Sequence, residues 1–271
     1  LGRTVAFVGA KGGCGASTIA HNVAWAVGKT FGTDVLIADF DLAWGTAGLD
    51  FNQDPTQGVL EALNAPERLD DTFLDRLLTK CSDHLSILGA PAMLDRTYDH
   101  QDHDFDAIIE VARGIVPMVV LDLPHMWTGW VKRQLCAADD VMIVTTPDLA
   151  GLRNAKGLID TLRTARPNDA PPHLLINTVG MPKRPEIKPE EFAKALELPV
   201  AATIPFDAAA FGNAANKGLM IGEMDAKHPS AETFRSLAAL ASGRREVRKA
   251  RRSALDLAPL LAKLRLPKKA S

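Results

Sequence analysis

A short glycine-rich segment, GAKGGCGAST at residues 9–18, follows directly on the apolar run TVAFV and could bind an anion. Glycines let the backbone turn so that several N–H groups face one phosphate, and the start of a helix adds a partial positive charge. Ser17 stands where a hydroxyl would ligate Mg²⁺, and Thr18 where it would contact phosphate. We therefore predict a phosphate-binding loop. The glycines that would curve the backbone around the phosphate are Gly12, Gly13 and Gly15.

The loop departs from the usual GxxxxGK[ST] pattern at two positions. Ala10 replaces the first glycine, Ala16 replaces the lysine, and another lysine, Lys11, lies five residues earlier. One alternative is a glycine turn that only packs a helix on a sheet. Cys14 is interpreted as a small apolar filler rather than a redox switch, since nothing indicates a lowered pKa.

Three aspartates follow apolar runs that read as strands. Asp39 and Asp41 follow VLIA, and Asp122 ends MVVLD. Carboxylates at these strand ends could hold Mg²⁺ or reach the γ-phosphate side of a nucleotide. The alternative for each is a carboxylate that caps a turn. Asn177 ends HLLIN, and its amide could meet a purine edge or serve in a turn.

Apolar runs alternate with amphipathic stretches along the chain. The runs lack polar alternation, which is typical of parallel strands covered on both faces. We therefore predict an α/β fold with a doubly wound, mostly parallel sheet and helices on both faces, whose ligand site lies beyond the carboxyl ends of the strands. The expected strands are 4–9, 34–39, 85–89, 118–123, 141–146, 173–178 and 200–205, and the expected helices are 17–30, 56–64, 103–113, 149–165, 189–197 and 229–243.

Several segments together resemble the MinD/ParA superfamily of P-loop ATPases. KGGCGAST resembles its deviant Walker A motif, VLIADFDLAWGTAGLDF its switch I, and MVVLDLPHMW its Walker B strand and switch II. LLINTVG and TIPFD resemble its later nucleotide-contacting segments. The resemblance covers about residues 3–243, and we expect residues 1–243 to form one ATPase domain, followed by a tail at residues 244–271.

The resemblance implies roles for particular residues, with ATP or ADP and Mg²⁺ as cofactors. Lys11 would reach across an ATP-sandwiched homodimer to the partner's phosphates, and Asp41 would position the attacking water. Asp39 and Asp122 would join Ser17 at Mg²⁺. The remaining ATP-binding positions would be Gly12, Gly13, Cys14, Gly15, Ala16, Thr18, Asn177, Pro205, Phe206 and Asp207.

Alanine in place of the second lysine, in VGAKGGCGASTIAHNVAWAV, looks most like the CpaE/TadZ branch. Members of that branch position the assembly machinery of type IVb (Flp/Tad) pili at a cell pole. The resemblance implies pilus-assembly secretion proteins as partners. Slow or weak ATP hydrolysis is expected from Ala16 itself, because alanine cannot neutralise the charge that develops on the phosphates. The resemblance also implies a receiver-like N-terminal domain before Leu1.

Composition sets further bounds. Residues 244–271 hold ten Lys/Arg and two Asp/Glu, a net of +8, whereas the whole chain carries −2. Leu257, Leu260, Leu261 and Leu264 would share one helical face, so this tail could meet a membrane surface or dock on protein. Three distant cysteines and no signal-peptide pattern indicate a cytoplasmic protein, at most peripheral to the inner membrane.

Two other functions stay open. A ParA-like partition ATPase would bind DNA non-specifically, without sequence-specific recognition, but partition cycles depend on hydrolysis. The second alternative function is a scaffold that does not use nucleotide. His100 and His103 in the acidic segment 95–107 could be imagined as a metal site, but acidic loops before helices are commonly solvated.

Overall fold

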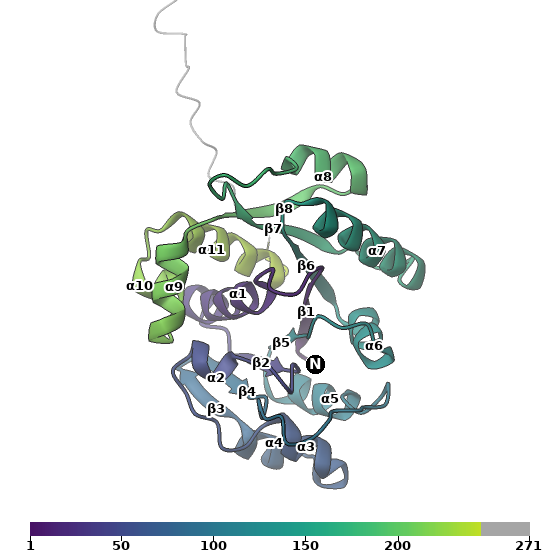
Figure 1. Cartoon of the computed structure of the whole chain (residues 1–271). Helices are drawn as coiled ribbons and strands as arrows, with labels where there is room; N and C mark the ends of the chain where they lie inside the picture. The colour runs from purple at the N-terminus through teal and green to yellow at the C-terminus, as the bar shows by residue number, and fades with distance from the viewer. Residues whose placement is uncertain (245–271) are drawn as a thin grey trace, which may run out of the picture.

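A central β-sheet organises the chain, and the computed structural model describes residues 1–244 (Figure 1). Within these residues eight strands lie in the order β3-β4-β2-β5-β1-β6-β7-β8, and only the β3–β4 pairing is antiparallel. The strands are β1 (Arg3–Gly9), β2 (Val35–Asp39), β3 (Thr79–Ser82), β4 (Leu85–Leu88), β5 (Met118–Asp122), β6 (Asp140–Thr145), β7 (His173–Val179) and β8 (Val200–Pro205).

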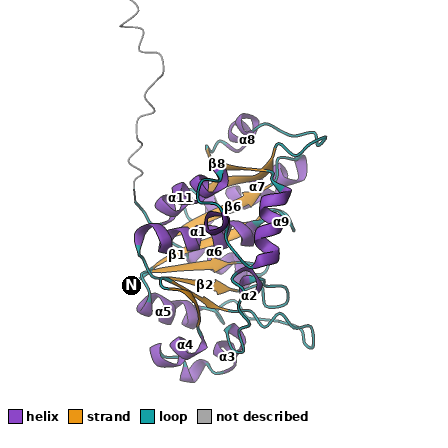
Figure 2. Ribbon diagram, turned by 90° about the vertical axis from the view of Figure 1, so that its left-hand side faces the viewer, coloured by secondary structure: helices purple, strands orange, loops and turns teal. Residues whose placement is uncertain are grey.

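The middle strands are buried because helices cover both faces of the sheet (Figure 2). Alternate side chains of β1 enter two separate apolar layers: Val5 and Phe7 join one, and Ala6 and Val8 the other. Such two-sided burial explains the continuous apolar runs in the sequence.

The helices divide between the two layers. α1, α2, α9, α10 and α11 contribute to the layer that contains Phe7, and α3 to α8 contribute to the layer that contains Val8. α1 packs along α11 (Figure 1). The helices are α1 (Ala16–Phe31), α2 (Ala47–Asp50), α3 (Val59–Asn64), α4 (Asp71–Leu77), α5 (Asp106–Ile115), α6 (Gly129–Ala137), α7 (Leu149–Ala165), α8 (Pro189–Leu196), α9 (Ala208–Lys217), α10 (Ile221–Met224) and α11 (Pro229–Ala241), with a 3-10 turn at Pro66–Arg68.

The predicted α/β architecture is confirmed, with small shifts at element ends. The helix expected over 56–64 begins only at Val59, because Gly58 is extended and pairs with Gly89 beside the sheet. The elements that were not predicted are the strand β3 and the helices α2, α4, α6, α9 and α10. Residues 245–271, with the expected leucine face, lie outside the described part of the chain.

None of the helices in residues 1–244 is both long enough and apolar enough to cross a bilayer.

Candidate nucleotide-binding site

The glycine-rich loop lies between β1 and α1, at the carboxyl edge of the sheet. Gly13 and Gly15 adopt φ of 74° and 88°, a left-handed conformation that glycine accepts at low cost. Gly15 caps α1, and no side chain accepts from the first turn. Within residues 1–244, the N–H groups from Gly15 to Thr18 donate to no protein acceptor. Four such donors at a helix start suit an anion.

Asn177 fixes the shape of this loop from the end of β7. Its Nδ2 donates to the carbonyl of Cys14 at 2.9 Å, and its Oδ1 accepts from the N–H of Thr178. A Cβ on Gly15 would lie 2.3 Å from Asn177 Nδ2, so only glycine fits there. Cys14 is buried, which raises the pKa of its thiol, and its Sγ faces the carbonyl of Val144. This environment fits the predicted filler role.

Two buried aspartates meet beside the loop. Asp39 and Asp122 are register partners in the β2–β5 pair. Burial, followed by the negative charge of Asp122, raises the pKa of Asp39 to about 7. Asp39 accepts the N–H groups of Asp41 and Ala47, and Ser17 Oγ donates to Asp122 Oδ1 at 3.1 Å. Hydroxyl and carboxylate oxygens of this kind fit Mg²⁺, whose positive charge would offset the repulsion between the two carboxylates.

Asp41 lies just beyond β2 and is half-buried, which raises the pKa of its carboxyl group. Its Oδ1 accepts the N–H of Trp44 at 3.3 Å, and its carbonyl accepts the N–H of Gly45. This contact closes a turn, the alternative that its sequence position left open. The carboxylate of Asp41 lies at the same edge of the sheet as that of Asp39. Its role toward a γ-phosphate stays a prediction.

His21 is a member of this cluster that sequence reasoning missed. Its Nδ1 lies 2.6 Å from Asp50 Oδ2, and its Nε2 lies 2.9 Å from Asp122 Oδ2. Burial lowers the pKa of this imidazole, but its bonds to the two carboxylates outweigh burial and raise that pKa to about 10. No local signal marks such a histidine, since its partners are 29 and 101 residues away.

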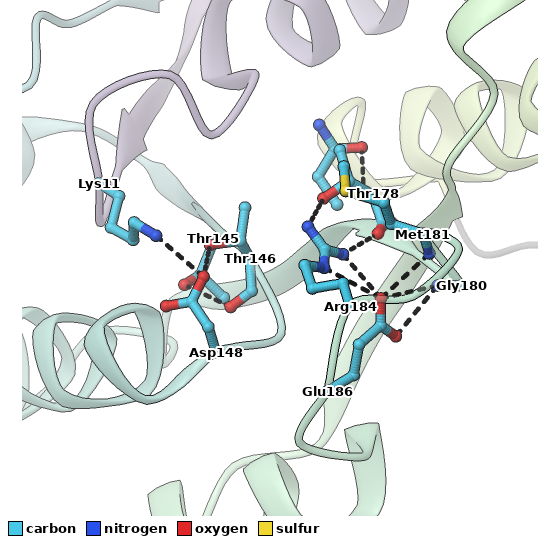
Figure 3. A network of polar contacts seen from close by, with 10 residues as sticks. Lys11, Thr145, Thr146, Asp148, Thr178, Gly180, Met181, Arg184 and Glu186 are labelled. Atoms are coloured by element: carbon cyan, nitrogen blue, oxygen red, sulfur yellow. Dashed lines mark hydrogen bonds and ion pairs between the residues drawn. The ribbon is translucent and has the colours of Figure 1, made fainter.

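Lys11 is paired within its own chain. Its Nζ lies 2.9 Å from Asp148 Oδ2, at the start of α7 (Figure 3). Asp148 also accepts from Thr146 Oγ1 at 2.6 Å and from the N–H of Gly151 at 2.8 Å. The lysine that the family resemblance directs toward a partner molecule is therefore held beside the loop in the single chain.

The turn after β7 is held by a second polar cluster. Arg184 bonds to Thr178 and Glu186, and Glu186 accepts the N–H groups of Gly180 and Met181 (Figure 3). Because Thr178 lines the neighbouring pocket, this cluster stabilises one wall of the site.

A pocket of about 230 Å³ opens between the loop and the segment after β8. Gly13, Gly15, Thr18 and Asn177 line it on one side, and the predicted turn of Pro205, Phe206 and Asp207 lines it on the other. Lys11, Gly12, Cys14, Ala16 and Ser17 belong to the same loop but are not among the described residues that line this pocket. Lining residues that the sequence did not single out are Asn22, Asp50, Thr178, Ala208, Phe211, Ala214, Ala215, Leu219, Met220 and Ile221.

Asp207 has a structural contact as well. Its Oδ1 accepts the N–H of Ala210 at the start of α9, and its other oxygen lies 3.2 Å from His228 Nε2. These contacts, the helix N–H first, lower the pKa of Asp207. Its carboxylate therefore anchors α9 at the rim of the pocket.

The fold is that of the MinD/ParA-type P-loop NTPases, and the comparisons agree. The chain resembles the septum site-determining protein MinD of Bacillus subtilis, 24% identical over 190 residues and 66% of either chain, just under two thirds of that relative. A ParA family ATPase of Chlorobium tepidum superposes with a TM-score of 0.79 at 25% identity, covering 88% of this chain and 99% of that one. MinD of Pyrococcus horikoshii, solved with Mg-ADP, superposes with a TM-score of 0.72 at 21% identity, covering 89% and 96%.

No protein-family model matches the chain. The relatives and the structural neighbours nevertheless support placing it in the MinD/ParA superfamily of ATPases, as the sequence resemblance predicts.

Proposed function

We propose that this chain binds ATP and Mg²⁺ and dimerises on ATP, acting as a switch with slow or weak hydrolysis. The observation that carries the proposal is the Ser17–Asp122 hydrogen bond at 3.1 Å. It lies beside the four N–H groups of residues 15–18, which have no acceptor among the described residues. That arrangement offers phosphate donors and magnesium ligands at one point. The Mg-ADP in the Pyrococcus MinD structure supports the same ligand chemistry here.

Ala16 is the reason that we expect slow hydrolysis. A lysine at this position would bridge the outer phosphates and neutralise charge as the bond breaks, and alanine cannot. One charge-assisted hydrogen bond is worth ~1.5–3 kcal/mol, so affinity falls about ten- to a hundredfold unless other groups compensate. The loop N–H groups, Mg²⁺ and Lys11 remain for binding.

Exposed apolar side chains support dimerisation at this edge of the sheet. Trp44 is 68% exposed, Trp127 54% and Leu149 73%. Trp44 lies three residues after Asp41, and Leu149 follows the Asp148 that binds Lys11. Large exposed apolar groups grouped around a polar site mark an interface. We propose that a second copy of the chain covers them and that Lys11 then contacts the partner's nucleotide.

The finer role that we propose is positioning of type IVb (Flp/Tad) pilus-assembly and secretion proteins. It rests on the resemblance of residues 8–27, with Ala16 in place of lysine, to the CpaE/TadZ branch. We further propose that the basic tail brings the protein to the cytoplasmic membrane surface, at a cell pole. Vesicle flotation with anionic lipid should require residues 244–271, and equal flotation without them would remove the tail from this proposal.

Light scattering tests the switch directly. We expect a monomer without nucleotide and with Mg·ADP, a dimer with Mg·ATP, and no dimer for Lys11→Ala. One constant mass under all conditions, together with no ATP binding by calorimetry, would favour the nucleotide-independent scaffold instead.

A further inference from the structure

A buried histidine connects the two parts of the candidate site. His21 lies on α1, one turn beyond Ser17, and its ring is fully buried. Each ring nitrogen faces a different carboxylate, Asp122 on one side and Asp50 on the other. Phe51 packs against the ring at 5.7 Å between centroids, so the imidazole has little freedom to turn.

At one end the histidine orients the carboxylate of Asp122. Oδ2 of Asp122 lies 2.9 Å from His21 Nε2, and Oδ1 accepts from Ser17. The carboxylate is thereby fixed in rotation with Oδ1 turned toward the hydroxyl that would share Mg²⁺. Such indirect partners set the orientation of metal-binding groups.

At the other end the histidine holds α2. Asp50 is the last residue of this short helix and lines the nucleotide pocket. It also accepts from Thr46 Oγ1, and the N–H of Ala47 donates to Asp39. Both buried strand-end carboxylates are therefore connected to α2, one directly and one through His21.

We propose that His21 is a positioning residue that couples the magnesium-site carboxylate Asp122 to Asp50 on α2, so that Mg-nucleotide binding orders α2. This inference rests on the proposed nucleotide binding and deepens it. The observations behind the proposal are the hydrogen bonds of His21 to Asp50 and to Asp122. A change at Asp122 on Mg²⁺ binding reaches α2 through one rigid ring.

Amide side chains can separate the two bonds. In His21→Asn the amide nitrogen occupies the place of Nδ1 and can still reach Asp50, whereas in His21→Gln it occupies the place of Nε2 and can still reach Asp122. Asp50→Ala removes the acceptor at the far end. His84→Gln is the matched control, because His84 is exposed and pairs with Asp34 on another part of the surface.

Two measurements on the full 271-residue chain test the coupling: calorimetry of ADP binding with Mg²⁺ or with EDTA, and hydrogen exchange of residues 46–52. In the wild type we expect Mg·ADP, but not ADP alone, to slow exchange in this segment. Mg²⁺ should raise the ADP affinity of the wild type, and in His21→Asn this increase should be ~10-fold smaller, as expected for an indirect partner of a metal site. His21→Gln should keep the full increase. All three site variants should lose the slowing of exchange, and His84→Gln should keep it.

The outcomes separate this inference from the function on which it rests. Wild-type exchange unchanged by bound Mg·ADP, or slowing retained in a folded His21 variant or in Asp50→Ala, would overturn the coupling and leave nucleotide binding intact. Failure of the wild type to bind ADP would overturn both. Thermal melting establishes which variants fold, and Asp50→Ala carries the test should the buried substitutions unfold the chain.

Discussion

Lys11 Nζ lies 2.9 Å from Asp148 Oδ2, so the lysine of the phosphate loop is anchored to the first turn of α7. Asp148 is also the N-cap of that helix through the N–H of Gly151. One carboxylate thus fixes both a helix start and the loop lysine. Protonation of Asp148 should therefore lower the free energy of unfolding.

We predict a stability difference between wild type and Asp148→Asn that depends on pH. Burial alone would raise the pKa of Asp148, but its bonds to Thr146, Lys11 and Gly151 lower it to about 2. A depressed pKa stabilises the fold above the unfolded value, near 4, and this contribution is lost as pH falls from about 4 to about 2. Asparagine keeps the capping geometry and removes the charge.

Urea unfolding at several pH values measures this difference. The free energy of unfolding of Asp148→Asn should fall below wild type at pH 7 and converge with it near pH 2. The control is Asp160→Asn on the exposed face of the same helix, where Asp160 pairs with Lys156. A difference for Asp148→Asn that is equal at all pH values would contradict the prediction.

Gly15→Ala should damage the loop, because alanine would be forced to φ of 88° with its Cβ 2.3 Å from Asn177 Nδ2. We expect a loss of unfolding free energy of ~1–3 kcal/mol and weaker binding of Mg·ADP. Gly157→Ala is the matched control: Gly157 is exposed in α7 with open space around it. That variant should gain ~0.5–1 kcal/mol. Equal effects of the two substitutions on melting and calorimetry would exclude a special role for Gly15.

Ala16→Lys should strengthen nucleotide binding by restoring the charge that the loop lacks. One charge-assisted hydrogen bond predicts a gain of about ten- to a hundredfold in Mg·ATP affinity by calorimetry. Hydrolysis should rise as well, because the lysine would stabilise the developing charge. Ala16→Gln, of similar length without charge, should gain much less. A gain as large for glutamine would show that length and not charge matters.

The sequence predicted the parts of the site that depend on strand ends and missed those that depend on distant contacts. Asp39 and Asp122 end continuous apolar runs, and parallel strands bring such ends to one edge. β3 escaped prediction because it is a half-exposed antiparallel edge strand. His21 looked like an ordinary helix residue, because only the tertiary fold brings its two carboxylates to it.

Trp44 and Trp127 provide the last prediction, which concerns the surface rather than the loop. Both are more than half exposed at the carboxyl edge of the sheet, in the segments that follow the site carboxylates Asp41 and Asp122. Burying an aromatic side chain against a partner contributes ~1.5–3 kcal/mol. The Trp44→Ser, Trp127→Ser variant should therefore weaken the ATP-dependent dimer by at least tenfold, measured by light scattering over a protein dilution series.

The same double variant should leave the affinity of the monomer for Mg·ADP unchanged, because neither tryptophan is among the described residues that line the nucleotide pocket. Leu1→Ser is the control, because Leu1 is 94% exposed but precedes β1 at the opposite edge of the sheet. A dimer weakened equally by Leu1→Ser would place the interface elsewhere. A dimer untouched by the tryptophan changes would mean that Lys11 and the nucleotide hold the two copies together without this apolar surface.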